Sequence, residues 1–391
     1  MGEVSTGTGL PSGFGAASAV KRAGASRAAA SRTRVIKASM MRRPEYDTFF
    51  PVRSILDARA LLSAVLLAFP PPPAGAEGFS VWAERARAEK DPEVRIDYCG
   101  KALERWRESD GTLNKAAVLS ARGNAFVLKR RYGQAVLDFS SAIGLSPGDP
   151  FPLNSRGIAY TRLRQYDRAL ADLDKAIGLD PDYAEAYVNR AIARHELGRR
   201  PEAFQDFDKA VELDAARPNP FLNRGIARCR ERDFKLGIED LGTALKLSPK
   251  DVEAFNSRGH CALLSGNLGL AQGDFLAALK IDRNSAAAYD GLGFVHLERE
   301  KPDRAKESFL KSLKVDVNRA DPYVGLALAW WKKKAPDRAL ASFRKAAVVD
   351  PVFTQGPDAI RRRASLAYTD KHLKTLLELA ARLAQERAQK R

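Results

Sequence analysis

The fold is decided by a stretch of the sequence that nearly repeats itself. Residues 150–183 read PFPLNSRGIAYTRLRQYDRALADLDKAIGLDPDY, and residues 184–217 read AEAYVNRAIARHELGRRPEAFQDFDKAVELDAAR. Each has a small residue at position 8 (Gly157 and Ala191) and alanines at positions 20 and 27. The same order of residues continues in both directions along the chain. A period of 34 residues therefore predicts stacked structural units rather than a single globular core.

Seven such units start at residues 116, 150, 184, 218, 252, 286 and 320 and end at 353. Positions 4, 8 and 11 share one helical face, and positions 20, 24 and 27 share another. The pattern predicts two helices per unit, joined by a turn near positions 14 and 15. One such hairpin cannot bury its own apolar face, so the units must stack to be stable. The position-8 residues are Gly123, Gly157, Ala191, Gly225, Gly259, Gly293 and Ala327.

This period and pattern resemble the tetratricopeptide (TPR) repeat family, whose unit is a helix-turn-helix of this length. The resemblance implies an all-α fold, a right-handed TPR superhelical solenoid of antiparallel helix pairs with no β-sheet. Residues 77–115 are interpreted as a diverged first hairpin, with Trp82, Ala86 and Ala88 in its first helix. Residues 354–391 are predicted to form a C-terminal capping helix, N-capped by Asp370, and a basic tail.

A second periodicity links positions 7 and 23. Arginine at position 7 and aspartate at position 23 occur together in the first five units and are lost together in the last two. In an antiparallel hairpin these positions lie at the same height, which predicts a ladder of ion pairs within or between units. A phosphate-binding arginine stripe would not need a matched carboxylate at each level. The pairs are Arg122 and Asp138, Arg156 and Asp172, Arg190 and Asp206, Arg224 and Asp240, and Arg258 and Asp274.

By resemblance to TPR proteins, positions 2, 5, 9, 12 and 13 of the first helix line a concave groove that binds a protein or peptide. The isoleucines at position 9 form an apolar strip, and the asparagines beside it are expected to hydrogen-bond a peptide backbone. Packing between units is the alternative role of these side chains. The candidate groove residues are Asn154, Ile158, Val188, Ile192, Leu222, Ile226, Asn256, His260, Phe294 and Trp331.

The net charge of +17 is concentrated in the ends of the chain. Residues 1–76 carry ten basic and four acidic side chains, and residues 354–391 carry nine and four. In the repeats the numbers of basic and acidic side chains are nearly equal. The repeats also have no regular pairing of aromatic and basic residues on which bases could stack, so a nucleic-acid partner is disfavoured. An organellar RNA-associated repeat protein that uses Arg361–Arg363 and the basic tail remains the alternative to a protein-binding scaffold.

The N-terminus has the composition of a targeting segment. Residues 1–38 are rich in Ala, Ser and Arg and poor in acid, as in an organelle transit peptide. Residues 39–76 are interpreted as a second, lumenal-type signal or a linker, because an apolar run at 60–69 precedes Ala74-Gly75-Ala76. This bipartite arrangement favours the chloroplast thylakoid lumen, with stroma, thylakoid membrane and mitochondrion as alternatives. The clients implied are thylakoid complexes, during photosystem assembly or maintenance.

No catalytic, cofactor-binding or metal motif is found, so an enzyme is not expected. His260 and His296 of neighbouring units are interpreted as solvent-facing or groove-lining residues, with a shared metal as the alternative. Cys99, Cys229 and Cys261 have no zinc-type spacing and are interpreted as small core residues. A bridge between the last two is the alternative.

Overall fold

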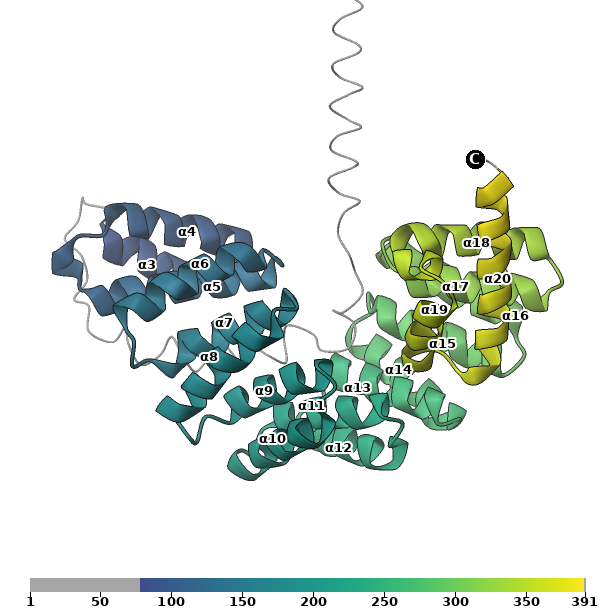
Figure 1. Cartoon of the computed structure of the whole chain (residues 1–391), viewed down its shortest axis with the longest axis horizontal. Coiled ribbons are helices and arrows are strands. Elements are labelled where there is room, and N and C mark those ends of the chain that lie inside the picture. Colours follow the sequence, from purple (N-terminus) through teal and green to yellow (C-terminus); the bar gives the residue numbers. More distant parts are fainter. Residues whose placement is uncertain (1–77, 390–391) are drawn as a thin grey trace, which may run out of the picture. The chain divides into compact units, whose positions relative to one another are not determined.

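The computed structural model describes residues 78–389, and every regular element in that range is a helix (Figure 1). Successive helices pair as hairpins, and each hairpin packs against the next one along the chain. The elements are α3 Phe79–Ala88, α4 Pro92–Arg105, η1 Glu108–Asp110, α5 Thr112–Leu128, α6 Tyr132–Leu145, α7 Pro150–Arg162, α8 Tyr166–Leu179, α9 Ala184–Glu196, α10 Arg200–Leu213, α11 Pro218–Arg230, α12 Phe234–Leu247, α13 Val252–Leu264, α14 Leu268–Ile281, α15 Ala286–Glu298, α16 Pro302–Val315, α17 Ala320–Lys332, α18 Pro336–Val349, η2 Pro351–Thr354, α19 Pro357–Ala367 and α20 Asp370–Gln389. The protein is an all-α solenoid of antiparallel helix pairs.

Six of the seven predicted units begin where the period places them. The helices α7, α9, α11, α13, α15 and α17 all start at position 1 of their unit, whereas α5 starts at Thr112, four residues before 116. Side-chain caps are present at three of these starts, those of α7, α13 and α15. The Asp149 carboxylate accepts a hydrogen bond from the backbone N–H of Phe151, and proline follows at Pro150, where a missing N–H has no cost.

The core of each hairpin sets a large side chain of the second helix against a small residue of the first. In unit 6 the buried Phe309 ring faces Gly293, and a Cβ at that glycine would overlap the ring. Gly325 of unit 7 touches the same ring from the other side. The small residues at position 8 are therefore required by close helix packing, as the period predicts.

The turn inside each unit passes through a left-handed residue at position 15. The φ angles of Arg130, Arg164 and Arg232 are 59°, 61° and 64°, and Gly198 and Gly266 take the same place at 79° and 84°. A residue of this conformation at the end of a helix closes the last turn and lets the chain reverse. The turn thus lies at the predicted position.

The residues before the repeats form a hairpin from α3 and α4. Trp82, Cys99 and Ala102 are buried in it, as the comparison with the repeat pattern predicts. Trp82, Ala86 and Ala88 lie in α3 as predicted, and Ala88 is exposed at its end. The Trp106 indole N–H donates to the carbonyl of Gly111 at 3.1 Å and secures the connection to α5.

The C-terminal segment contains more structure than the single capping helix that the sequence predicts. Two elements, η2 and α19, precede α20. The predicted apolar face comprises Leu373, Leu376, Ala380 and Leu383. Leu376 and Leu383 are buried in the core, and Leu379 joins them. Asp370 is the first residue of α20 rather than its N-cap, and its carboxylate pairs with Arg232 at 2.8 Å.

Within residues 78–389, no helix combines the length and the apolar character needed to cross a bilayer. The two targeting segments predicted at 1–38 and 39–76, including the apolar run at 60–69, lie outside the described residues.

Candidate protein-binding face

An ion pair joins the two helices of each of the first five units. In every pair the arginine donates through Nε and Nη2 to both oxygens of the aspartate sixteen residues later. This bidentate arrangement is the strongest form of an arginine–carboxylate contact. The Nη2–Oδ1 distances are 2.7 Å for Arg122–Asp138, 2.7 Å for Arg156–Asp172, 2.8 Å for Arg190–Asp206, 2.8 Å for Arg224–Asp240 and 2.7 Å for Arg258–Asp274.

In the middle of the array the ion pairs also connect neighbouring units. Arg224 donates through Nη1 to Asp208 of the preceding unit at 2.7 Å. Its partner Asp240 accepts a further bond from Arg228 at 2.8 Å. Unit 3 has the same arrangement, in which Arg190 donates to Asp174 at 2.6 Å and Asp206 accepts from Arg194 at 2.7 Å. The ladder therefore holds units to one another as well as the two helices within each unit.

The ladder arginines have little capacity left for an external ligand. The exposed fractions of their side chains are 14–25%, and those of the aspartates are 4–10%. Hydrogen bonding to Asp138 raises the pKa of Arg122 above its ordinary value. In units 6 and 7 the buried Leu292 and Leu326 replace arginine at position 7. These contacts give the ladder a structural role.

The apolar strip at position 9 does not line an open groove. Ile158, Ile192 and Ile226 are buried in one core cluster, together with Val188 and Leu222 of position 5. These five side chains take the alternative role and pack within and between units.

The two candidate asparagines also have partners within the protein. Asn154 donates from Nδ2 to the Tyr183 hydroxyl at 3.1 Å, and its Oδ1 accepts from Asn189 of the next unit at 2.8 Å. Asn256 is less buried and donates to the Ser285 hydroxyl at 3.1 Å. The Asn154 side chain is buried, and its amide nitrogen and its amide oxygen each have a partner within the protein. The Asn256 Oδ1 accepts no hydrogen bond from the described residues.

In unit 6 the inner face is covered by the chain's own C-terminal segment. The Phe294 ring at position 9 lies 5.4 Å from the Tyr368 ring and 6.2 Å from the His372 ring, centroid to centroid. Glu298 at position 13 pairs with Lys371 at 3.3 Å and accepts a hydrogen bond from the Thr369 hydroxyl. Phe294 therefore binds a polypeptide, but that polypeptide belongs to this chain.

Unit 7 is covered in the same way. Asp321 at position 2 accepts hydrogen bonds from the Tyr368 hydroxyl at 2.5 Å and from Arg363 at 2.7 Å. The Arg382 guanidinium lies 5.0 Å from the centre of the Trp331 ring at position 12. Trp331 is therefore half-buried under α20 rather than presented to an external ligand. Apart from the amphipathic pattern of the segment, no feature of the sequence indicates that it covers units 6 and 7.

The histidines and other candidate ligands form no metal site. In the described part of the chain no three His, Cys, Asp or Glu side chains are placed to hold a metal ion. His195 is buried, with its Nε2 3.0 Å from a carboxylate oxygen of Glu231 in the next unit. His260 at position 9 is half-buried.

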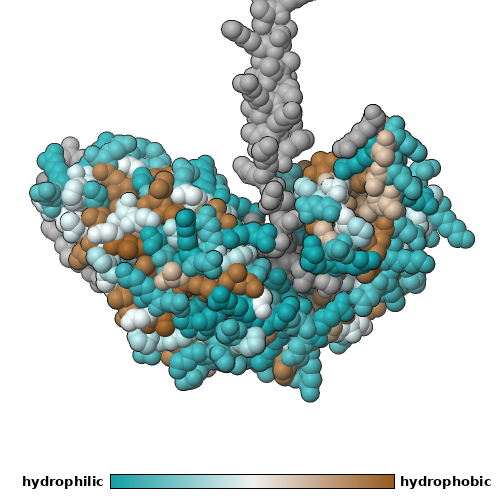
Figure 2. Space-filling model, viewed as in Figure 1, coloured by the Kyte–Doolittle hydropathy of each residue, from teal (hydrophilic) through white to brown (hydrophobic). Residues whose placement is uncertain are grey.

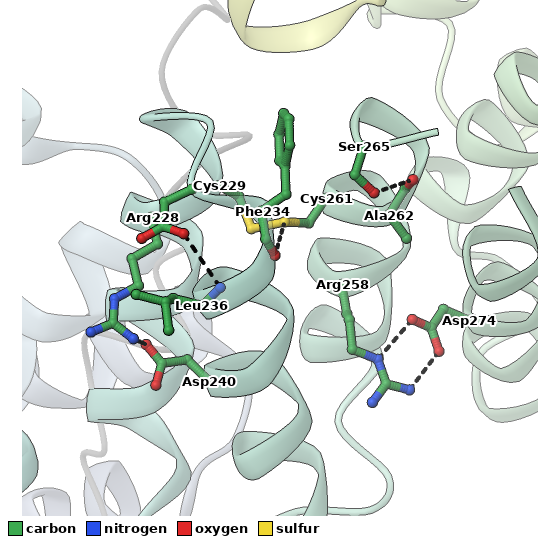
Figure 3. Close-up of a disulfide and its surroundings, with 11 residues drawn as sticks. Arg228, Cys229, Phe234, Leu236, Asp240, Arg258, Cys261, Ala262, Ser265 and Asp274 are labelled. Atoms are coloured by element: carbon green, nitrogen blue, oxygen red, sulfur yellow. Dashed lines mark hydrogen bonds and ion pairs between the residues drawn. A yellow bond between two sulfur atoms is a disulfide. The ribbon is translucent and has the colours of Figure 1, made fainter. Parts of the chain in front are cut away.

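A disulfide joins the first helices of units 4 and 5 (Figure 3). It links Cys229 and Cys261, whose Cα atoms are 5.5 Å apart. The interpretation of all three cysteines as reduced core residues is therefore wrong for two of them. Cys99 is the free cysteine of the described region, and burial raises the pKa of its thiol to about 12, which keeps it unreactive.

A sequence signal for the disulfide was present at position 20. Six units have alanine there, whereas unit 4 has Gly237. A Cβ at Gly237 would overlap the Sγ of Cys229. The missing methyl group thus accommodates the bridge, a relation that the spacing of the cysteines alone does not reveal.

Hydrophobic side chains are set among hydrophilic ones over α5 to α8 in Figure 2. The inner face of units 6 and 7 already holds a polypeptide, the C-terminal segment. These two observations are those of a helical-repeat protein suited to protein–protein interaction. The model of the tetratricopeptide repeat family matches residues 154–220, 222–287 and 292–359. These matches cover more than half of the chain, which belongs to the tetratricopeptide repeat family. Proteins of this family are typically non-catalytic interaction scaffolds.

Solved structures with the same fold share little sequence with this chain. Yeast Tom70 is 18% identical, with a TM-score of 0.56, and the match covers 81% of this chain and 69% of Tom70. A chain of the APC/C hetero-tetramer Cut9–Hcn1 is 18% identical, with a TM-score of 0.55 and coverage of 77% and 55%. A tetratricopeptide repeat protein from Parabacteroides merdae is 19% identical, with a TM-score of 0.51 and coverage of 65% and 99%.

This chain therefore spans only about half the length of the Cut9–Hcn1 chain. At these identities the structures show a shared fold. A comparison with curated protein sequences found no match.

Proposed function

We propose that this protein is a non-catalytic scaffold that holds a segment of a client protein on the inner face of units 1–5. The observation that carries the proposal is the binding of polypeptide at the same repeat positions in units 6 and 7. There, positions 2, 9, 12 and 13 hold the C-terminal segment through ring contacts, hydrogen bonds and ion pairs. The first five units have the same arrangement of helices. The helix α20 covers chiefly units 6 and 7.

The client contacts lie at the rim positions of the first helices, because positions 5 and 9 are mostly buried in packing. Phe151 and Asn219 at position 2 and Leu264 at position 13 are half-exposed. They offer an aromatic ring, an amide and an aliphatic side chain. Such a mixture suits a client segment with alternating apolar and polar residues.

Site-specific photo-crosslinking in native extracts tests the proposal. A photo-reactive amino acid at Asn219 or Leu264 should capture the same client. A matched probe at Leu137, which is 69% exposed on the second helix of unit 1, should not capture it. Equal capture from all three positions would show that the inner face is not the binding site.

The proposed clients are thylakoid membrane complexes, and the proposed compartment is the thylakoid lumen. The targeting composition of residues 1–76 and the Cys229–Cys261 disulfide support an oxidising compartment outside the cytosol. Sequencing the N-terminus of the mature protein from its native cells tests this. A start at Glu77 is expected for lumenal delivery. A start near Ser39 would place the protein in the stroma or on a membrane and exclude the lumen.

A further inference from the structure

The turns between the first and second helices of successive units lie side by side along one edge of the solenoid. Glu196 and Arg230 both occupy position 13, in units 3 and 4, and pair at 2.6 Å. His195 at position 12 likewise reaches Glu231 at position 14 of the next unit. Equivalent turn residues are therefore in contact between neighbouring units. We name positions 13–19 of units 1–4 the A–B edge; these are residues 128–134, 162–168, 196–202 and 230–236.

The A–B edge of units 1–4 is strongly basic although the repeats as a whole are nearly balanced. It contains eleven Lys and Arg side chains and five Asp and Glu side chains. Glu196 and Glu231 pair with Arg230 and Arg200, and Asp233 caps α12. Two acidic residues from outside, Glu93 and Asp370, also pair with this edge. Together these residues comprise eleven basic and seven acidic side chains, a net charge of +4.

Each of the four segments of this edge also exposes one leucine, in or next to the turn. The exposed fractions are 37% for Leu128, 38% for Leu163, 37% for Leu197 and 39% for Leu236. Leucines next to arginines and lysines recur in all four units, so a partner meets both kinds of side chain at once. Basic side chains with interspersed large apolar residues are typical of surfaces that bind the interface of an anionic bilayer.

The opposite edge provides an internal comparison. Its turns, residues 145–150, 179–184, 213–218 and 247–252, contain five acidic and two basic side chains. Leucines are exposed there as well, at 42% for Leu179 and 40% for Leu247. Exposed leucine is thus common to both edges, and the positive charge is specific to the A–B edge.

We infer that the A–B edge of units 1–4 docks this protein on an anionic lipid bilayer. The basic side chains contact the headgroups, and the four leucines enter the interfacial region. A bilayer fits better than RNA, because exposed leucines gain nothing from a phosphate backbone, whereas burial among lipid chains removes them from water. This docking is independent of the client site, which lies on the inner face.

Co-sedimentation of the full chain with vesicles tests the inference. We expect binding to phosphatidylcholine vesicles that contain phosphatidylglycerol, weakening with salt, and much weaker binding to phosphatidylcholine alone. Arg199→Glu/Lys235→Glu should lower the affinity by about 25-fold, since each basic residue near an anionic surface contributes about fivefold. Both side chains are exposed and form no ion pair in the described region.

A control of equal charge separates the edge from net charge. Lys250→Glu/Lys280→Glu changes the total charge by the same amount, at Lys250 in a turn of the opposite edge and at Lys280 in the last turn of α14, and should leave binding nearly unchanged. Leu163→Ser/Leu197→Ser should weaken binding, whereas Leu179→Ser/Leu247→Ser should not. Equal losses in both charge variants would overturn the inference. So would an Arg199→Glu/Lys235→Glu variant that loses single-stranded RNA and keeps its vesicle affinity, because the edge would then be an RNA surface.

Discussion

Arg258 and Asp274 form a simple pair of the ladder, because neither joins a second ion pair in the described region. Replacing Arg258 leaves the buried Asp274 carboxylate without its partner, and replacing Asp274 leaves a half-buried guanidinium. We expect Arg258→Leu and Asp274→Ser each to lower the free energy of unfolding by about 2 kcal/mol, less than for a fully buried pair. Arg258 retains 21% exposure, which reduces the cost. Urea unfolding followed by circular dichroism measures the loss.

The double variant Arg258→Leu/Asp274→Ser provides the decisive comparison. It reproduces the residues of unit 6, where Leu292 and Ser308 pack without an ion pair. We expect it to be more stable than either single variant. If the two single losses simply add, the side chains do not act as a pair.

Gly237 gives a second prediction at this scale. Gly237→Ala should destabilise the oxidised protein by about 1–3 kcal/mol, because the added methyl overlaps the Cys229 sulfur. In a background of Cys229→Ala/Cys261→Ala the same change should cost less. The contact with the Gly225 carbonyl at 3.0 Å remains there, so some cost persists. Thermal unfolding of the four proteins compares the two costs, and equal values would contradict the link between Gly237 and the bridge.

Individual residues show where sequence reasoning succeeds and where it stops. The partners Arg190 and Asp206 could be predicted because two columns of the repeat change together. The burial of Ile158 and Val188 could not, because position 9 looks the same whether it faces solvent or a neighbouring helix. Only the spacing between adjacent units separates these two cases.

At the scale of elements, the disulfide ties α11 to α13 across the junction of units 4 and 5. It closes a loop with a sequence separation of 32 residues. Loop-closure entropy predicts that Cys229→Ala/Cys261→Ala loses about 3–4 kcal/mol of stability. Unfolding in urea, with and without a reducing agent, measures the effect. The wild-type protein should lose stability on reduction and the double variant should not. A wild type that is insensitive to the reducing agent would contradict this.

The repeated helices were predictable element by element, and the C-terminal ones were not. A 34-residue period repeats the same packing, so it predicts the start of α9 or α15 to the residue. The position of α20 depends on contacts between distant residues, such as Arg232 with Asp370 and Asp321 with Tyr368. No local pattern encodes these contacts. The contacts of the candidate groove residues Phe294 and Trp331 with this segment could therefore not be predicted.

At the scale of the whole molecule, buried titrating groups predict how stability depends on pH. Burial lowers the pKa of His195, His296 and His372 below the ordinary value of 6.5. The folded state therefore resists protonation of these rings, while the unfolded chain takes up protons near pH 6.5. Their contribution to stability is fully present above that pH and is lost as the pH falls through the lower folded-state pKa values.

Between about pH 4 and 6, Asp290 changes the stability of the folded state in the direction opposite to the histidines. Burial raises the pKa of its carboxyl from 3.8 to about 6, although Arg319 lies 2.8 Å away and opposes the shift. The folded state therefore holds this proton more firmly than the unfolded chain does. As the pH falls from about 6 towards 4, protonation of Asp290 increases the free energy of unfolding. Between pH 5.5 and 7.5, the three histidines and Asp290 therefore make opposing contributions to the pH dependence of the free energy of unfolding.

Single variants separate these contributions. We expect the wild-type protein to unfold at lower urea concentration at pH 5.5 than at pH 7.5, because three histidines outweigh one carboxyl in this interval. His372→Gln should reduce that difference, since glutamine can replace the neutral ring beside Thr369 and Glu298 without titrating. Asp290→Asn should increase the difference, because it removes the opposing group. The wild type and the two variants could instead show the same change of unfolding midpoint with pH. That result would mean that groups other than His372 and Asp290 control stability in this range.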